Sequence, residues 1–185
     1  MGNREEVQQA AEALTTGNST QRADAAIAVL RLARNRASLL PVRERLLATL
    51  DDAEFTGCTA VALALLVDSW RFLGLLPTID ALEALSVGAN QVQAKAAIIR
   101  AAKLRSDIAG ASQPLVPLLA AGLPQTAPIL AQLAAQGADV SPCLAAIETA
   151  LEPLIVRADT AQEQTLARLW MSTLGRVNNA VVEGC

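Results

Sequence analysis

Histidine and tyrosine are absent from this chain of 185 residues, and aromatic side chains make up only 2% of it. Without histidine, the chain cannot perform Ser-His-Asp or Cys-His catalysis, and it lacks the commonest general base and the commonest zinc ligand. It also contains no Gly-rich phosphate loop, no GxSxG elbow and no carboxylates at metal-ligand spacing. We therefore expect no enzymatic activity, no cofactor and no metal.

Cysteine is scarce as well, because Cys58, Cys143 and Cys185 are the only three and form no CxxC pair. A chain of this length buries enough surface to fold without disulfides. We expect Cys58 and Cys143 to pack in helix interfaces, although Cys143 follows Pro142 near a helix start and could instead be reactive. The polar segment 1–12 lacks the apolar run of a secretion signal. These features indicate a reducing, cytoplasmic location.

Charge is missing from one long interval, between Asp107 and Asp139. Four prolines and several glutamines interrupt it, so it lacks the run of about 20 apolar residues that a membrane-spanning helix needs. The apolar run 55–67 is too short to span, and we expect a helix buried on all sides there. No membrane span is predicted. The formal net charge of −3 argues against a protein that gains affinity by neutralising phosphates.

The residues that are abundant favour helices. Alanine, leucine, glutamine, glutamate and arginine fill long stretches bounded by glycine and proline, and the alternation typical of strands is missing. Helices are predicted over 4–14, 22–37, 41–50, 55–72, 77–88, 91–106, from 114, over 124–136, from 142 to 151, and from 160. Ser19 or Thr20 is expected to cap the second helix. That helix has one apolar stripe, formed by Ala26, Val29, Leu30, Ala33 and Ala37.

A repeat is visible in the shorter helices. Each begins at a proline, and these prolines lie 36, 37 and 28 residues apart: Pro41, Pro77, Pro114 and Pro142. An aliphatic side chain stands five positions after each proline: Leu46, Leu82, Leu119 and Ile147. Helix pairs that recur with such a period are typical of solenoids.

The segment 20–152 resembles the HEAT family, whose second helix often begins with proline and has a leucine-rich tail, as in Ser141-Pro-Cys-Leu-Ala-Ala-Ile-Glu-Thr-Ala-Leu151. The resemblance implies an all-α, right-handed α-solenoid of about four to five antiparallel helix pairs. It implies a single domain 1–185, with an N-terminal capping helix in 1–18, repeats in 19–152 and a C-terminal capping helix in 153–185. The arginine and aspartate of many HEAT turns occur irregularly here. Armadillo-like repeats and a non-repeating helical bundle remain alternatives.

Positive charge gathers in two groups, one on Arg31, Arg34, Arg36, Arg43 and Arg45, the other on Lys95, Arg100, Lys103 and Arg105. In a solenoid the two groups could merge into a basic strip, while the alternative is two ordinary solvated helix faces. Asp68 is placed to pair with Arg71, and these two with Trp70 or Phe72 could instead form part of a groove. The candidate partner-binding residues are Arg31, Arg34, Asp68, Trp70, Arg71, Arg100 and Lys103.

These observations favour a non-catalytic protein-binding module that uses a solenoid surface, either a scaffold or an inhibitor of the immunity-protein type. The resemblance also implies an alternative, because HEAT-like folds include alkylpurine DNA glycosylases, which bind nucleic acid through a basic face. Few aromatics and a negative net charge speak against it. A HEAT-like enzyme subunit is a third hypothesis. The sequence leaves open the identity of the protein partner, the face that binds it and self-association.

Overall fold

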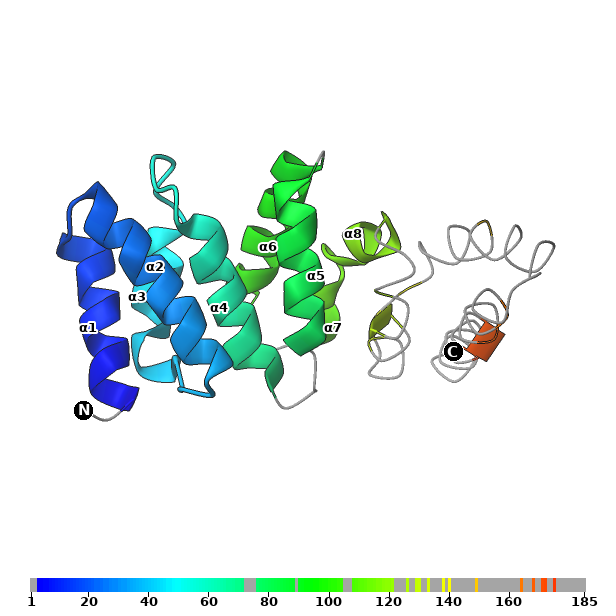
Figure 1. Cartoon of the computed structure of the whole chain (residues 1–185), viewed down its shortest axis with the longest axis horizontal. Helices are drawn as coiled ribbons and strands as arrows, with labels where there is room; N and C mark the ends of the chain where they lie inside the picture. The colour runs from blue at the N-terminus through cyan, green and yellow to red at the C-terminus, as the bar shows by residue number, and fades with distance from the viewer. Residues whose placement is uncertain are drawn as a thin grey trace. The chain divides into compact units, whose positions relative to one another are not determined.

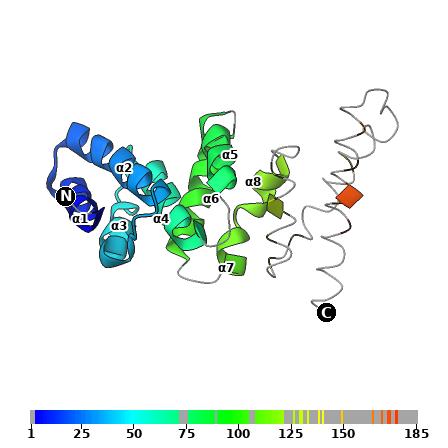
Figure 2. The ribbon, with the colours of Figure 1, turned by 60° about the horizontal axis from the view of Figure 1, so that its bottom comes forward.

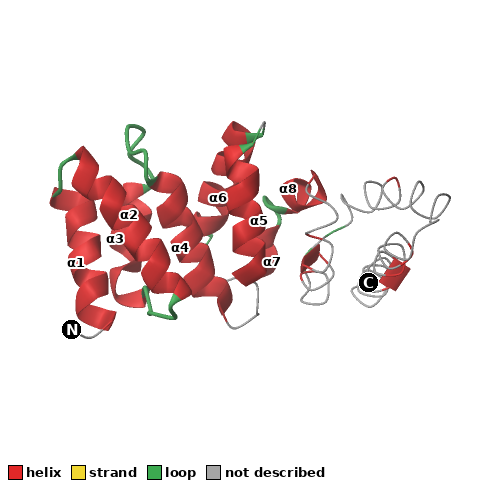
Figure 3. Cartoon of the chain, viewed as in Figure 1, coloured by secondary structure: helices red, strands yellow, loops and turns green. Residues whose placement is uncertain are grey.

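The computed structural model describes residues 3–71, 76–88, 90–104 and 108–121, with isolated positions between 126 and 175. Helices joined by short turns account for these residues, and no strand occurs in the ranges just given (Figure 3). The predicted all-helical class is confirmed. The helices predicted beyond residue 121 lie outside the described residues, except for isolated positions. Several residues named in the predictions are not described, among them Phe72, Cys143, Ile147, Trp170 and Cys185.

The α-helices of the described residues are labelled in Figure 1. In chain order the elements are α1 (Asn3–Thr16), α2 (Ser19–Arg34), the unlabelled 3-10 helix η1 (Leu40–Val42), α3 (Arg43–Thr49), α4 (Cys58–Trp70), α5 (Leu76–Val87), α6 (Gln91–Lys103), α7 (Ile108–Ser112) and α8 (Val116–Ala121). Contacts divide the chain into two compact units, residues 1–80 with 95–106, and residues 81–94 with 107–185. No helix within the described ranges is long and apolar enough to cross a membrane.

The first unit is built around α4. This helix packs against α2 and α3, and α1 packs against the same two helices (Figures 1 and 2). Every residue from 61 to 67 is buried, as the apolar run predicted, because charged residues are missing from that stretch. Four residues of the stripe predicted for the second helix are buried on α2: Ala26, Val29, Leu30 and Ala33. The fifth, Ala37, is also buried, but it lies beyond the helix, because α2 ends at Arg34 and not at the predicted residue 37. These apolar surfaces form the core of the first unit.

The start of α2 differs from the prediction, since Asn18 caps it rather than Ser19 or Thr20. The Gln21 backbone N–H donates to Asn18 Oδ1 at 3.0 Å, and the Asn18 backbone N–H donates to Gln21 Oε1 at 2.9 Å. This reciprocal pair is a capping box, in which two otherwise unsatisfied N–H groups find partners. Asn18 is the cap because Gln21, three residues later, completes a capping box with it.

The start of α4 also differs, because the helix begins at Cys58 and not at Phe55. Phe55 is only 5% exposed, so it packs in the core from the preceding turn. Asp52 holds that turn by accepting the Glu54 backbone N–H at 3.1 Å. Cys58 is a buried free thiol, which agrees with the packing role predicted for it.

The recurring aliphatic position is buried wherever its side chain is described. Leu46, Leu82 and Leu119 each have an exposed fraction of 0%. Leu104, which directly follows the end of α6 at Lys103, is 41% exposed, so the helix predicted over 91–106 ends earlier than expected. The five-residue helix α7 was not predicted, and α8 begins two residues after Pro114.

Candidate functional site

The end of α2 has an unusual backbone. The Arg36 N–H donates to the Ala33 carbonyl and the Ala37 N–H donates to the Leu32 carbonyl, both at 3.0 Å. These two bonds form a Schellman motif, which normally places glycine at the left-handed position. Here Arg36 occupies it with a φ of 64°, as no other non-glycine in the described ranges does. A side chain costs about 1–2 kcal/mol in this conformation, so stability alone does not account for an arginine here.

Arg36 opens onto a pocket of about 410 Å³. The two-residue connection between α1 and α2 makes them antiparallel, so the start of α1 and the end of α2 lie at the same end of the pair (Figure 1). This brings Arg4, from the first turn of α1, to the same pocket. We call it the arginine pocket, lined by Arg4, Arg36, Ala37, Ser38 and Pro41.

Both arginines of the pocket are exposed, and no carboxylate of the described residues pairs with either of them. Glu5 directly follows Arg4, but residues one apart on a helix do not face each other. Ser38 adds a hydroxyl group, whose oxygen accepts the Leu40 backbone N–H at 3.4 Å. The pocket therefore offers two guanidinium groups and a hydroxyl proton without an internal counter-charge. Such a set attracts oxyanions.

An exposed apolar residue, Leu40, directly precedes Pro41 of the pocket in the sequence. Leu40 is 73% exposed, whereas its neighbour Leu39 is fully buried. The Leu39 backbone N–H donates to Asp68 Oδ1 at 3.1 Å, which fixes the segment to α4 and leaves Leu40 facing solvent. Residues 36–41 therefore expose both a positive charge, on Arg36, and an apolar side chain, that of Leu40.

Asp68 also pairs with Arg71, whose Nη1 lies 3.3 Å from Asp68 Oδ1, so the predicted ion pair is present. The Asp68 side chain is only 9% exposed, and the carboxylate positions the segment that holds Leu39. Trp70 is 1% exposed and therefore packs in the core of the first unit. Neither side chain offers much area to a partner.

The remaining candidates fall into two sets. Arg34 forms an ion pair with Asp80, and Lys103 forms one with Asp51, so carboxylates offset part of the charge that the two basic groups bring. Arg43, from the first group, donates through Nη1 to Ser69 Oγ at 3.2 Å. By contrast, Arg31 and Arg100 are exposed, and neither forms an ion pair within the described residues.

Sequence reasoning placed Arg36 in a basic group without selecting it as a site residue, and it missed Arg4 altogether. Asn35 was a signal of a helix end just before Arg36, but the apolar stripe continues to Ala37 and predicted a helix through position 36. No such signal existed for Arg4, since its place depends on how α1 packs against α2.

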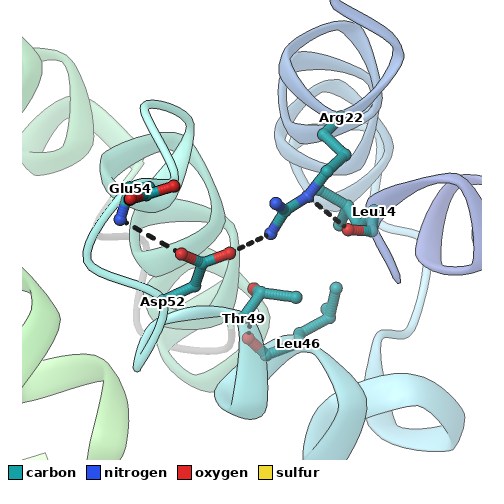
Figure 4. A network of polar contacts seen from close by, with 6 residues as sticks. All are labelled: Leu14, Arg22, Leu46, Thr49, Asp52 and Glu54. Carbon is teal, nitrogen blue, oxygen red and sulfur yellow. Dashed lines mark hydrogen bonds and ion pairs between the residues drawn. The ribbon is translucent and has the colours of Figure 1, made fainter. Parts of the chain in front are cut away.

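The opposite end of α2 contains an arginine with a different environment (Figure 4). Arg22 Nε donates to the Leu14 carbonyl at 2.9 Å, Nη2 pairs with Asp52 Oδ2 at 2.7 Å, and the guanidinium lies 4.7 Å from the centre of the Phe55 ring. The hydrogen bond from Arg22 and then the backbone N–H of Glu54 lower the pKa of Asp52. This network links α1, α2 and the turn before α4, and it is structural.

Comparison with protein-family models, with curated proteins and with solved structures finds no match for this chain. Within the described residues, no three acidic or cysteine side chains come together as metal ligands would. The function has to be inferred from the residues of the chain itself.

Proposed function

We propose that the chain is a non-catalytic protein-binding module that uses the surface of a HEAT-like solenoid, as a scaffold or as an inhibitor of the immunity-protein type. One observation carries the proposal: exposed Leu40 directly precedes Pro41, which lines a pocket with two arginines that pair with no carboxylate of the described residues. Protein interfaces combine an apolar centre with a polar rim, and arginine is enriched in them.

A second exposed pair on α2 supports the same function. Ile27 is 64% exposed and Arg31, four residues later, is exposed too. Residues four apart share a helix face, so α2 again places an apolar side chain beside a positive charge. A binding surface that includes Leu40 and the solvent side of α2 would contain both pairs.

The nucleic-acid alternative is less favoured. It depends on a basic strip, and both Arg34 and Lys103 of that strip form ion pairs with aspartates. A net charge of −3 also opposes the approach of a polyanion. Labelled duplex DNA at low salt, where phosphate contacts are strongest, provides the direct test. Its retardation by the chain would favour this alternative over the protein-binding module.

The protein-binding module is tested by an affinity pull-down with the tagged full chain from native cell extract, followed by mass spectrometry of the salt eluate. We expect one stoichiometric protein partner, lost when Leu40→Asp is the bait. Val92→Asp is the matched control, because Val92 is 82% exposed on α6, away from residues 36–41 in the sequence. Equal recovery of the partner with both variants, or recovery of nucleic acid instead, would contradict the proposal.

A further inference from the structure

We infer that the arginine pocket binds a carboxylate group of an acidic peptide segment. The inference rests on the proposed function and names the chemistry of the partner. The partner segment would place a glutamate or aspartate side chain, or its C-terminal carboxylate, between Arg4 and Arg36, with an aliphatic side chain against Leu40.

The electrostatics of the pocket give the first argument. Arg4 and Arg36 line one cavity, both are exposed, and no described carboxylate pairs with them. Arg22, Arg34 and Arg71 of the same unit each have an aspartate partner, whereas Arg31 and Arg100 also have none among the described residues. Arg4 and Arg36 differ from Arg31 and Arg100 in that they line one pocket together. A guanidinium binds a carboxylate through two parallel N–H donors, and this geometry is specific to the pair. A carboxylate of another molecule would therefore give Arg4 and Arg36 the ion-pair partner that no described residue provides.

The backbone gives a second, independent argument. Arg36 adopts the left-handed conformation at the end of α2, where glycine would fit without a Cβ penalty. Residues held in such conformations cluster at ligand-binding sites, where the side chain repays the strain. The conformation turns the chain sharply between α2 and Ser38, and it places the Arg36 side chain in the wall of the pocket.

The size and lining of the pocket favour a peptide over a phosphate polymer. A volume of about 410 Å³ lies near the lower end of the range for small-ligand sites, about 300–1,000 Å³, so it suits a side chain or a chain terminus. Ala37 and Pro41 add apolar lining, and Leu40, directly before Pro41 in the sequence, is exposed. The Ser38 oxygen accepts a backbone N–H, which leaves the hydroxyl proton for a carboxylate oxygen.

The binding test uses fluorescently labelled peptides and the full chain, with anisotropy as the measurement. The main probe is Leu-Glu-Glu-Leu with an amidated C-terminus, compared with Leu-Gln-Gln-Leu of the same length. We expect the glutamate peptide to bind at least about tenfold more tightly, because charged hydrogen bonds are the stronger ones. The peptide Leu-Gln-Gln-Leu with a free C-terminus separates the two sources of carboxylate: tight binding assigns the pocket to a chain terminus, weak binding to acidic side chains.

Three variants locate the binding. Arg36→Gly removes the guanidinium while suiting the left-handed backbone, so the fold is retained. Arg4→Ala removes the other guanidinium from an exposed position. Each should weaken the carboxylate peptide about tenfold or more. The control is Arg45→Ala, which removes an exposed arginine of α3 that does not line the pocket. It should bind as the original chain does.

Equal affinity of the original chain and Arg36→Gly for the carboxylate peptide would overturn the inference, as would binding of a phosphoserine peptide alone. Failure of the proposed function is recognised separately. If no carboxylate peptide binds but the pull-down partner still depends on Leu40, the carboxylate assignment is wrong and the protein-binding module remains. If the peptide binds through Arg36 and no protein partner is recovered, the pocket is an anion site and the module is wrong.

Discussion

Helices α4 and α2 pack against each other, yet they use their surfaces in opposite ways. In α4 all residues from Val61 to Val67 are buried. Asp68, the one charged residue of that helix, accepts a hydrogen bond from the Leu39 backbone N–H. In α2 one face is buried and the other presents Ile27 and Arg31 to solvent. The comparison shows that α4 holds the first unit together while α2 and its C-terminal turn are available for binding.

The two ends of α2 sharpen this contrast. Arg22 at the start has a carbonyl, a carboxylate and an aromatic ring as partners. Arg36 just past the end has a left-handed backbone, and no carboxylate among the described residues pairs with it. The same residue type is therefore structural at one end and a candidate ligand-binding group at the other. Partner atoms, rather than residue identity, decide between the two roles.

The largest expected effect separates the buried helix from the exposed face. Leu65→Ala in α4 should lower the free energy of unfolding by about 2–5 kcal/mol, because Leu65 is fully buried and its removal leaves a cavity. Ile27→Ala on α2 should change it by less than about 0.5 kcal/mol, since Ile27 is 64% exposed. Urea unfolding followed by circular dichroism measures both. Equal losses would break the comparison between the two helices.

A smaller effect is expected where α4 begins against α2. A Cβ on Gly57 would lie 2.7 Å from the Ala26 Cβ and 2.6 Å from a Phe55 ring carbon. The φ of −84° permits alanine, so Gly57→Ala tests close packing alone, and we expect a loss of about 1–3 kcal/mol from overpacking. The control is Gly88→Ala, whose Cβ would meet only carbonyl oxygens, at 3.8 and 3.9 Å. A thermal melt of Gly57→Ala that matches the control would show that α2 and α4 tolerate a wider separation.

Much of this division between helices could be predicted from the sequence. The apolar run in α4 and the stripe in α2 encode burial through residues three and four apart, and such local patterns survive in the fold. The recurring leucines were predicted from their constant place five residues after each repeated proline. The arginine pocket could not be predicted, because it depends on the meeting of α1 with the end of α2. The pairing of Arg34 with Asp80 joins residues 46 apart, a separation at which local periodicity carries no information.

The Arg22 end of α2 is tested by pH. The pKa of Asp52 in the folded chain lies below its ordinary value of 3.8, chiefly because Arg22 donates a hydrogen bond to it. The charged form is thus favoured by folding, so its contribution is fully present above about pH 4 and disappears as pH falls through the lowered pKa. Asp52→Asn should therefore melt below the original chain at pH 7, and the gap should close in acid.

The control for this experiment is Asp24→Asn. Asp24 is exposed on α2, the helix that carries Arg22, and forms no ion pair within the described residues. Its melting temperature should follow that of the original chain at every pH. If the difference in melting temperature between Asp52→Asn and the original chain stayed constant from pH 7 to pH 3, the ion pair of Asp52 with Arg22 would not stabilise the fold.

The smallest effect in stability concerns the other end of α2, and its sign matters more than its size. Arg36→Gly removes the Cβ strain of the left-handed backbone but gives the unfolded chain more conformational freedom. We therefore expect the free energy of unfolding to rise by about 0–1 kcal/mol. Arg31→Gly, five residues earlier and inside the helix, should instead lower the free energy of unfolding by about 0.5–1 kcal/mol. Chemical denaturation resolves the difference between the two variants. Opposite signs would show that the fold prefers glycine at position 36, so that the guanidinium there serves binding rather than stability, whereas equal losses would mean that the Arg36 side chain stabilises the turn itself.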